Sequence, residues 1–324
     1  MSDERFLVTG AAGCLGAWTV ARLIAERTPV VAFDASDDGR RLRLLIEDND
    51  LAGLTRIRGD IRNLDEISGL IDTYTITHIV HLAALQVPFC KADPVLGSEV
   101  NVTGTVNVLE AVRRADGLVR GLVYASSAAA FGTAAHYRGG IASDNDLLLP
   151  ATLYGVYKQA NEGTARVYAA DWGVGSVGLR PCIVYGPGRD QGLTSDPTKV
   201  MLAAAAGRSG HIAFGGSSTF HHADDVAAAF IAAARLEVSD ALVHNIGGTD
   251  ASVAEVATAV ERSVPGTRVT FEDEPLPLPA GVDGSPLAAL LGVAVQFRSL
   301  ERGVADSVDH FRRLLDRGLL TQPD

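Results

Sequence analysis

Short apolar runs alternate with longer amphipathic stretches through the first half of the chain. This alternation limits the possible folds more than any other feature of the sequence. The apolar runs span residues 6–8, 30–33, 56–58, 79–82, 118–125 and 177–184. The helical patterns between them span residues 15–26, 64–71, 99–114 and 154–171. Strands that are apolar on both faces, each followed by a helix, are typical of a parallel sheet covered on both sides. The sequence therefore predicts an α/β fold, a Rossmann-type doubly wound parallel sheet.

The character of the sequence changes near Gly186, where the Gly- and Pro-rich segment GPGRDQGLTSDP begins. Helical patterns at 199–206, 225–235 and 300–315 follow, with a short strand at 242–246. We expect a dinucleotide-binding domain at 1–185 and a smaller C-terminal, substrate-binding lobe at 186–324. The two are expected to interleave, with part of 225–250 packing back on the first domain.

Composition excludes several classes of function. The formal net charge is −11 and no basic run is present, which argues against binding to nucleic acid or anionic lipid. The apolar windows are short and interrupted, and the first residues lack the pattern of a secretory leader, so no membrane association is expected. Cys14, Cys90 and Cys182 are far apart and lack metal-ligand spacing. We expect free thiols, no metal, and a cytoplasmic location.

A glycine-rich turn, TGAAGCLG at 9–16, separates the first strand from the first helix. Gly10 permits a tight turn, Gly13 allows a pyrophosphate to approach the backbone, and Gly16 allows the helix to pack closely on the strand. A glycine turn alone is weak evidence, but its position between strand and helix predicts a dinucleotide site.

Two acidic residues support this interpretation. Asp34 ends the second strand, where a carboxylate reaches the adenosine ribose hydroxyls and repels a 2′-phosphate. NAD is therefore favoured over NADP, although Arg40 and Arg41 nearby point the other way. Asp60 follows the third strand and can bind the adenine amine, or equally cap the helix that begins near Leu64.

The stretch LYGVYKQA at 153–160 contains two tyrosines and a lysine. In a helix, Tyr154 and Lys158 share one face, whereas Tyr157 points about 100° away from Lys158. A nearby ammonium stabilises phenolate, which would lower the tyrosine pKa toward the range of a general base. Upstream, a strand ends in Ser126 and Ser127, at the sheet edge where ligands bind in such folds.

With these parts assembled, the chain resembles the extended short-chain dehydrogenase/reductase family, which includes NAD-dependent epimerases and dehydratases of sugars. The resemblance covers nearly the whole chain. It rests on these segments, taken in order: TGAAGCLG at 9–16, GDIRN at 59–63, HLAA at 81–84, NVTGTVNVLEA at 101–111, SSAAAFG at 126–132, YGVYK at 154–158, RPCIVYGPG at 180–188, HHADDVA at 221–227 and NIGG at 245–248.

The resemblance implies roles for particular residues. It makes Tyr154 the acid/base, with Lys158 lowering its pKa and holding the nicotinamide ribose, and Ser127 polarising the reacting oxygen. Hydride would pass between the substrate carbon and nicotinamide C4. It also implies a homodimer through the helices at 99–114 and 154–171. The expected cofactor-binding residues are Gly10, Ala12, Gly13, Cys14, Leu15, Gly16, Asp34, Asp60, Ile61, Leu82, Ala83, Ala84, Asn101, Tyr154, Lys158, Pro181 and Ile183.

The substrate side departs from the pattern of relatives that act on nucleotide sugars. Those relatives usually carry an Arg before the HxDD motif, but 215–222 reads GGSSTFHH. Ile183 stands where they often have Asn. An anion could still meet Arg189 or Lys199. We therefore expect a dehydrogenase or reductase of a small hydroxy or keto compound, with Gln86, Ser126, Arg189, Thr194 and His222 as candidate substrate residues. The alternatives are a sugar epimerase and a non-catalytic NAD-binding sensor.

Overall fold

A seven-stranded sheet forms the centre of the computed structural model, which describes residues 3–320. All neighbouring strands pair in parallel, in the order β11-β7-β5-β4-β1-β2-β3. Their bounds are β1 (Phe6–Thr9), β2 (Val30–Asp34), β3 (Thr55–Arg58), β4 (His78–His81), β5 (Gly121–Ala125), β7 (Ser176–Arg180) and β11 (Ala241–Asn245). This arrangement confirms the predicted Rossmann-type α/β fold.

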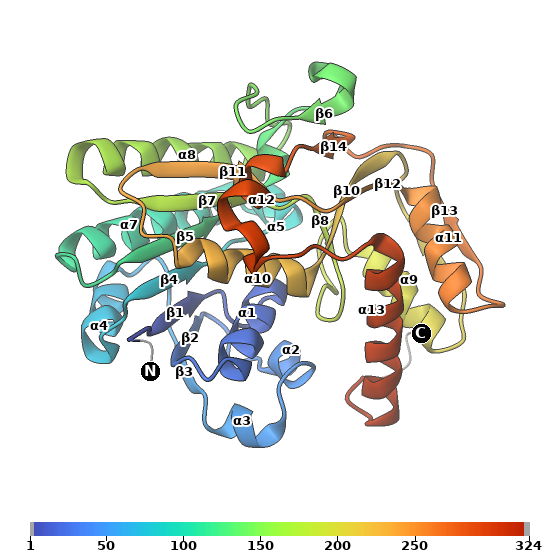
Figure 1. The fold of residues 1–324 in the computed structure, drawn as a ribbon, viewed down its shortest axis with the longest axis horizontal. Coiled ribbons are helices and arrows are strands. Elements are labelled where there is room, and N and C mark those ends of the chain that lie inside the picture. The colour runs from blue at the N-terminus through green and yellow to red at the C-terminus, as the bar shows by residue number, and fades with distance from the viewer. Residues whose placement is uncertain (1–2, 321–324) are drawn as a thin grey trace.

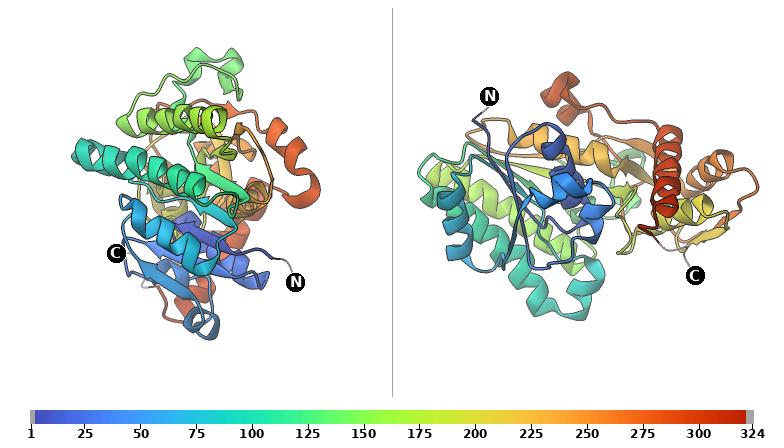
Figure 2. Two further views of the ribbon diagram at one scale, coloured as in Figure 1. Left: turned by 90° about the vertical axis from the view of Figure 1, so that its left-hand side faces the viewer. Right: turned by 90° about the horizontal axis from the view of Figure 1, so that it is seen from below.

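Helices cover both faces of this sheet. One face carries α1 (Cys14–Ala25) and α10 (Ala223–Ala234), where the alanine-rich sequence of α10 allows the two helices to pack closely. The other face carries α4 (Leu64–Tyr74), α7 (Gly104–Arg114) and α8 (Leu153–Trp172) (Figure 1). The left panel of Figure 2 shows α8, α7 and α4 running side by side. No helix within residues 3–320 has the length and apolar character needed to cross a membrane.

A second apolar core lies beside the main sheet, at the right of Figure 1. It is built on α9 (Asp196–Ala205), α11 (Val253–Ser263) and α13 (Leu300–Asp316). A three-stranded sheet, β8 (Ile183–Tyr185), β10 (Ser217–His222) and β12 (Thr249–Ser252), connects it to the first core. The smaller elements are α2 (Arg40–Arg43), α3 (Asp48–Ala52), α5 (Val87–Ala92), α6 (Pro94–Ser98), β6 (Ile141–Ala142), β9 (Gly210–Ile212), β13 (Val269–Phe271), β14 (Gly281–Val282) and α12 (Ser285–Leu291).

One predicted strand was wrong. The apolar run at 177–184 is not a single strand, because it divides at Pro181 into β7 and β8. Proline has no N–H to donate, so the ladder of the main sheet ends there, and β8 pairs with β10 in a different sheet. The sequence pattern suggests one strand because the residues of both strands are buried. The division into 1–185 and 186–324 stays a prediction.

Candidate active site

Two adjoining pockets lie at the carboxyl ends of the parallel strands. The chain builds β1, β2 and β3 outward and then crosses back to β4 on the other side of β1, which opens a crevice between β1 and β4. The first pocket has a volume of about 240 Å³ and the second about 480 Å³. Both pockets are lined by Gly10, Gly13, Cys14, Leu82, Ala84, Gln86 and Arg189, so they form one cleft.

The glycine turn forms the floor of this cleft. Gly10 has φ of +71°, and a methyl group there would overlap the backbone of Leu82 and Ala83. A methyl group on Gly16 would overlap the carbonyl oxygen of Gly10. The N-terminus of α1, which begins at Cys14, faces the second pocket, and the amides at such a terminus suit a pyrophosphate. The glycines thus allow the turn to pack closely on the residues after β4 and on the start of α1, and a tight turn at this place fits a dinucleotide such as NAD.

The acidic end of β2 also fits an adenosine ribose. Asp34 lines the second pocket and accepts hydrogen bonds from the backbone N–H groups of Ala12 and Ser36, both at 2.9 Å. Arg40 and Arg41, which could have bound a 2′-phosphate, both pair with Asp190, at 2.7 and 2.6 Å. Both guanidinium groups are engaged by carboxylates, Arg40 by Asp38 as well as Asp190, and this arrangement favours NAD over NADP.

Asp60 lines the second pocket as well, beside Ile61. It does not cap the next helix, because Asn63 performs that role by accepting from the N–H groups of Asp65 and Glu66. The side chain of Arg62 lies 2.6 Å from Asp60 and, through its hydrogen bonds, lowers the pKa of that carboxyl. The carboxylate is therefore held by Arg62 at the wall of the adenosine pocket.

Ser127, Tyr154 and Lys158 all line the first pocket. Lys158 is buried, its Nζ donates to the carbonyl oxygen of Ala125 at 2.7 Å, and it lies 5.4 Å from the ring centre of Tyr154. Tyr157 points elsewhere, because its hydroxyl donates to the carbonyl oxygen of Pro94. The helix geometry thus brings Tyr154 and Lys158, not Tyr157, to Ser127.

The expected pKa shift of Tyr154 needs correction. In the chain without cofactor, burial raises the pKa of the phenol, and a hydrogen bond with Ser127 and the charge of Arg189 only partly oppose this effect. Burial also lowers the pKa of Lys158, to about 8. Near neutral pH the site therefore holds a neutral phenol beside an ammonium group.

A buried ion pair holds Ser126, which follows the end of β5. Glu162, one turn beyond Lys158 on α8, pairs with Arg180 at 2.7 Å, and both side chains are about 5% exposed or less. The hydroxyl of Ser126 donates to Glu162 at 2.5 Å. Ser126 touches the pocket wall, but its hydroxyl is committed to this network. The hydroxyl therefore supports the end of β5, and contact of Ser126 with substrate stays a prediction.

Most of the other expected cofactor residues also line the cleft. They are Ala12, Leu15, Ala83 and Pro181. Asn101 and Ile183 line neither pocket. Asn101 is buried and bonds both backbone groups of Leu85, at 2.7 and 2.9 Å, so it fixes the loop that forms the wall. Ile183 belongs to the second apolar core, because β8 turns away after Pro181.

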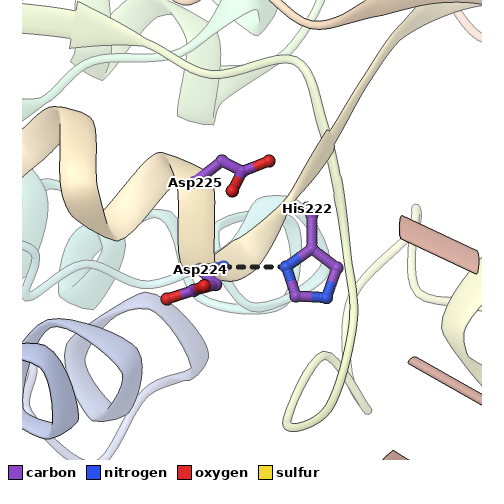
Figure 3. Close-up of side chains that lie close together, drawn as sticks. All are labelled: His222, Asp224 and Asp225. Carbon is purple, nitrogen blue, oxygen red and sulfur yellow. Dashed lines mark hydrogen bonds between the residues drawn. The ribbon is translucent and has the colours of Figure 1, made fainter. Parts of the chain in front are cut away.

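The candidate substrate residues separate into two groups. Gln86, Arg189 and Thr194 line the first pocket. His222 lies outside both pockets, and its expected contact with substrate was wrong. It is the N-cap of α10, where its Nδ1 accepts from the N–H of Asp224 at 3.2 Å (Figure 3). Trp18 and Tyr185 pack edge-on against its ring, and burial lowers its pKa to about 3, so the imidazole stays neutral.

His222, Asp224 and Asp225 lie close enough together to suggest a metal site, and Figure 3 shows the two carboxylates pointing in different directions. Both carboxylates are bound to arginines. Asp224 pairs with Arg22 and Arg298, and Arg298 also lies 2.6 Å from Asp225. This network joins α1, α10 and the segment before α13, and we interpret it as structural.

Sequence reasoning missed one wall of the first pocket. Leu276, Pro277 and Leu278 line it together with Leu193. Apolar residues in a Pro-rich loop carry no chemical signal, and only tertiary contacts, such as the bridge between Gly215 and Pro275, bring them to the cleft. Thr152 and Cys182 were also missed. Thr152 lies just before the YGVYK motif and Cys182 lies within the RPCIVYGPG motif, so these positions could have identified them.

Comparison with known proteins identifies the family. The sequence model of the NAD dependent epimerase/dehydratase family matches residues 6–247. The UDP-glucose 4-epimerase of Mycolicibacterium smegmatis is 32% identical over 318 residues, which cover 95% of this chain and 98% of that protein. The UDP-glucose 4-epimerase of Thermus thermophilus, solved in complex with NAD, is 26% identical with a TM-score of 0.80, covering 95% of this chain and 99% of that chain. A partial consensus L-threonine 3-dehydrogenase is 25% identical with a TM-score of 0.81 over the same shares. The chain belongs to the NAD-dependent epimerase/dehydratase family of the extended short-chain dehydrogenases/reductases.

Proposed function

We propose that the protein is an NAD-dependent oxidoreductase that transfers hydride between nicotinamide and a small hydroxy or keto compound. The observation that carries this proposal is the first pocket, which joins Ser127, Tyr154 and Lys158 to the glycine turn. When bound there, the nicotinamide accepts or returns the hydride. The protein's own residues orient the substrate and move the proton.

Each residue has a part in the proposed reaction. The Oγ of Ser127 accepts from the N–H of Ala129 at 3.1 Å. Its own proton is shared with Tyr154 in the chain without substrate and would donate to a substrate oxygen in the proposed complex. The phenolate form of Tyr154 takes the hydroxyl proton during oxidation, and the phenol form returns it during reduction. Lys158 is anchored by Ala125, so its other N–H donors face the cleft and its charge favours the phenolate.

The lining of the pocket supports a small substrate. Lys199, which could have met a diphosphate, lines neither pocket within the described residues and pairs with Asp196 at 3.1 Å. Beyond Lys158, Arg189 is the cation that lines the first pocket, and the opposite wall is apolar. A nucleotide diphosphate would thus meet a single guanidinium.

The test is turnover with Tyr154→Phe, followed by absorbance of the reduced nicotinamide across small alcohols, hydroxy acids, aldoses and uronates. The variant should still bind NAD and lose nearly all activity, because the phenylalanine has no proton to exchange. Wild-type-like activity in this variant would refute the assignment of the acid/base.

A sugar epimerase is the second candidate. The full-length similarity to a UDP-glucose 4-epimerase favours it. An epimerase returns the hydride to the same substrate and has no need to release its cofactor. We would denature the purified protein and quantify the nicotinamide released per chain. Near-stoichiometric NAD, with stereoisomer formed and no net reduced nicotinamide, would identify an epimerase. Reversible binding of added NAD supports the dehydrogenase.

A non-catalytic sensor is less well supported, because Ser127, Tyr154 and Lys158 share one pocket.

We also propose a homodimer through α7 and α8. Among the apolar residues of these helices, Leu109 is buried in the core of the subunit, whereas Val167 is 51% exposed and free to contact a partner. Light scattering tests this proposal.

A further inference from the structure

Two buried polar atoms in the cleft have no hydrogen-bond partner. Within residues 3–320, seven buried side-chain nitrogen or oxygen atoms are unpaired. Among these, Gln86 Oε1 and Arg189 Nε belong to residues that line the pockets. Buried polar groups are normally paired, so unpaired ones beside a cleft are positions where a ligand can supply the missing partners.

The two side chains converge at the junction of the pockets, beneath the loop that contains Gly192. A side chain at Gly192, which has φ of +96°, would overlap Gln86 Oε1 and touch Arg189 Nη1. Thr194 holds the guanidinium by accepting from Nη2 at 2.9 Å. Arg189 lines both pockets together with Cys14 of the glycine turn, and it lines the first pocket together with Tyr154.

The charges around this junction are unbalanced. The charged side chains that line the first pocket are Lys158 and Arg189, and no carboxylate from the described part of the chain lies among them. Arg40 and Arg41 are both engaged by Asp190. Arg189 has no ion-pair partner among residues 3–320 and thus offers its charge to a ligand.

We propose that the substrate is a small polyhydroxy carboxylate whose carboxylate is bound by Arg189 and one of whose hydroxyls donates to Gln86 Oε1. The inference rests on the proposed function and names its substrate class. The planar guanidinium matches a carboxylate, with two parallel hydrogen bonds. A diphosphate has no hydrogen-bond donor at neutral pH and would leave Gln86 Oε1 unpaired. The amides of the glycine turn remain available for the diphosphate of the cofactor.

The experiment compares Arg189→Gln with a matched control, Arg312→Gln, which removes an arginine from an exposed pair with Asp309. The substrates are gluconate and glucuronate, each paired with its neutral amide. Loss of a charge-assisted hydrogen bond should lower kcat/KM for the acids roughly 10- to 100-fold while the amides change little. Affinity for NAD, measured by calorimetry, should stay within about twofold, since the inference assigns Arg189 to the substrate.

Two results would overturn the inference. One is a wild-type protein that treats acids and amides alike. The other is an Arg189→Gln variant that loses NAD affinity and keeps its preference for acids, which would assign the guanidinium to the cofactor's diphosphate. Failure of the proposed function looks different, because Tyr154→Phe would then stay active. Calorimetry of gluconate with NAD-loaded Tyr154→Phe, with and without Arg189→Gln, measures anion binding without turnover. Equal binding by the two proteins also contradicts the inference.

Discussion

The buried ion pair between Glu162 and Arg180 should contribute strongly to the free energy of unfolding. Glu162→Ala removes the carboxylate that accepts from Arg180 at 2.7 and 2.8 Å and leaves a guanidinium that is 4% exposed. Breaking such a pair costs about 3–5 kcal/mol, because the remaining charge is uncompensated. An unfolding entropy of about 2.1 cal/mol/K per residue amounts to about 0.7 kcal/mol/K for 324 residues. The melting temperature should therefore fall by about 4–7 °C.

Scanning calorimetry on the cofactor-free protein measures this shift. The matched control is Glu47→Ala, which breaks an exposed pair with Arg317 whose side chains are 73% and 47% exposed. Exposed pairs contribute about 0–1 kcal/mol, so this variant should melt within about 1.5 °C of wild type. Replacing both Glu162 and Arg180 by Met removes both charges and should cost less than Glu162→Ala. The reasoning fails if Glu162→Ala is as mild as Glu47→Ala, or if the double variant melts below the single one.

Three other substitutions test separate parts of the cleft. Burial lowers the pKa of Lys158 from 10.5 to about 8. Below pH 8 this group therefore destabilises the fold, by roughly 3 kcal/mol, and the penalty disappears as pH rises toward 10.5. Inactive Lys158→Met should resist urea better than wild type at pH 7, and equal stability there would contradict this. Gly16→Ala places a methyl group on a backbone oxygen and should abolish NAD binding in calorimetry, whereas Gly69→Ala, in open space, should bind NAD normally. Asp190→Asn should speed NAD release roughly 3- to 10-fold in stopped-flow fluorescence, as loss of its pairs with two arginines loosens the loop. Asp37→Asn, which breaks an exposed pair, should leave the rate unchanged, and a similar rise in both variants would refute the role of the loop.

Tertiary packing decided where the second half of the chain lies. The run at 177–184 has the composition of one buried strand, yet Pro181 divides it between two sheets. His222 lies beside two aspartates in sequence, as a site histidine could, but it is closed off by Trp18 and Tyr185. Apolar periodicity does not show whether a buried run divides between two sheets. Proximity to carboxylates does not show whether a histidine faces a cleft. Both depend on residues that are distant in sequence.

The parts of the site that depend on local geometry could be predicted from the sequence. The spacing of Gly10 and Gly16 defines a turn that only glycines can form, and the four-residue spacing of Tyr154 and Lys158 places both on one helix face. Which charges remain available depends on the folded chain. Asp190 engages both Arg40 and Arg41, although about 150 residues separate them, while Arg189, next to Asp190 in sequence, has no ion-pair partner among residues 3–320. Pairing between charges depends on distances across the folded chain, and the local sequence pattern does not encode these distances.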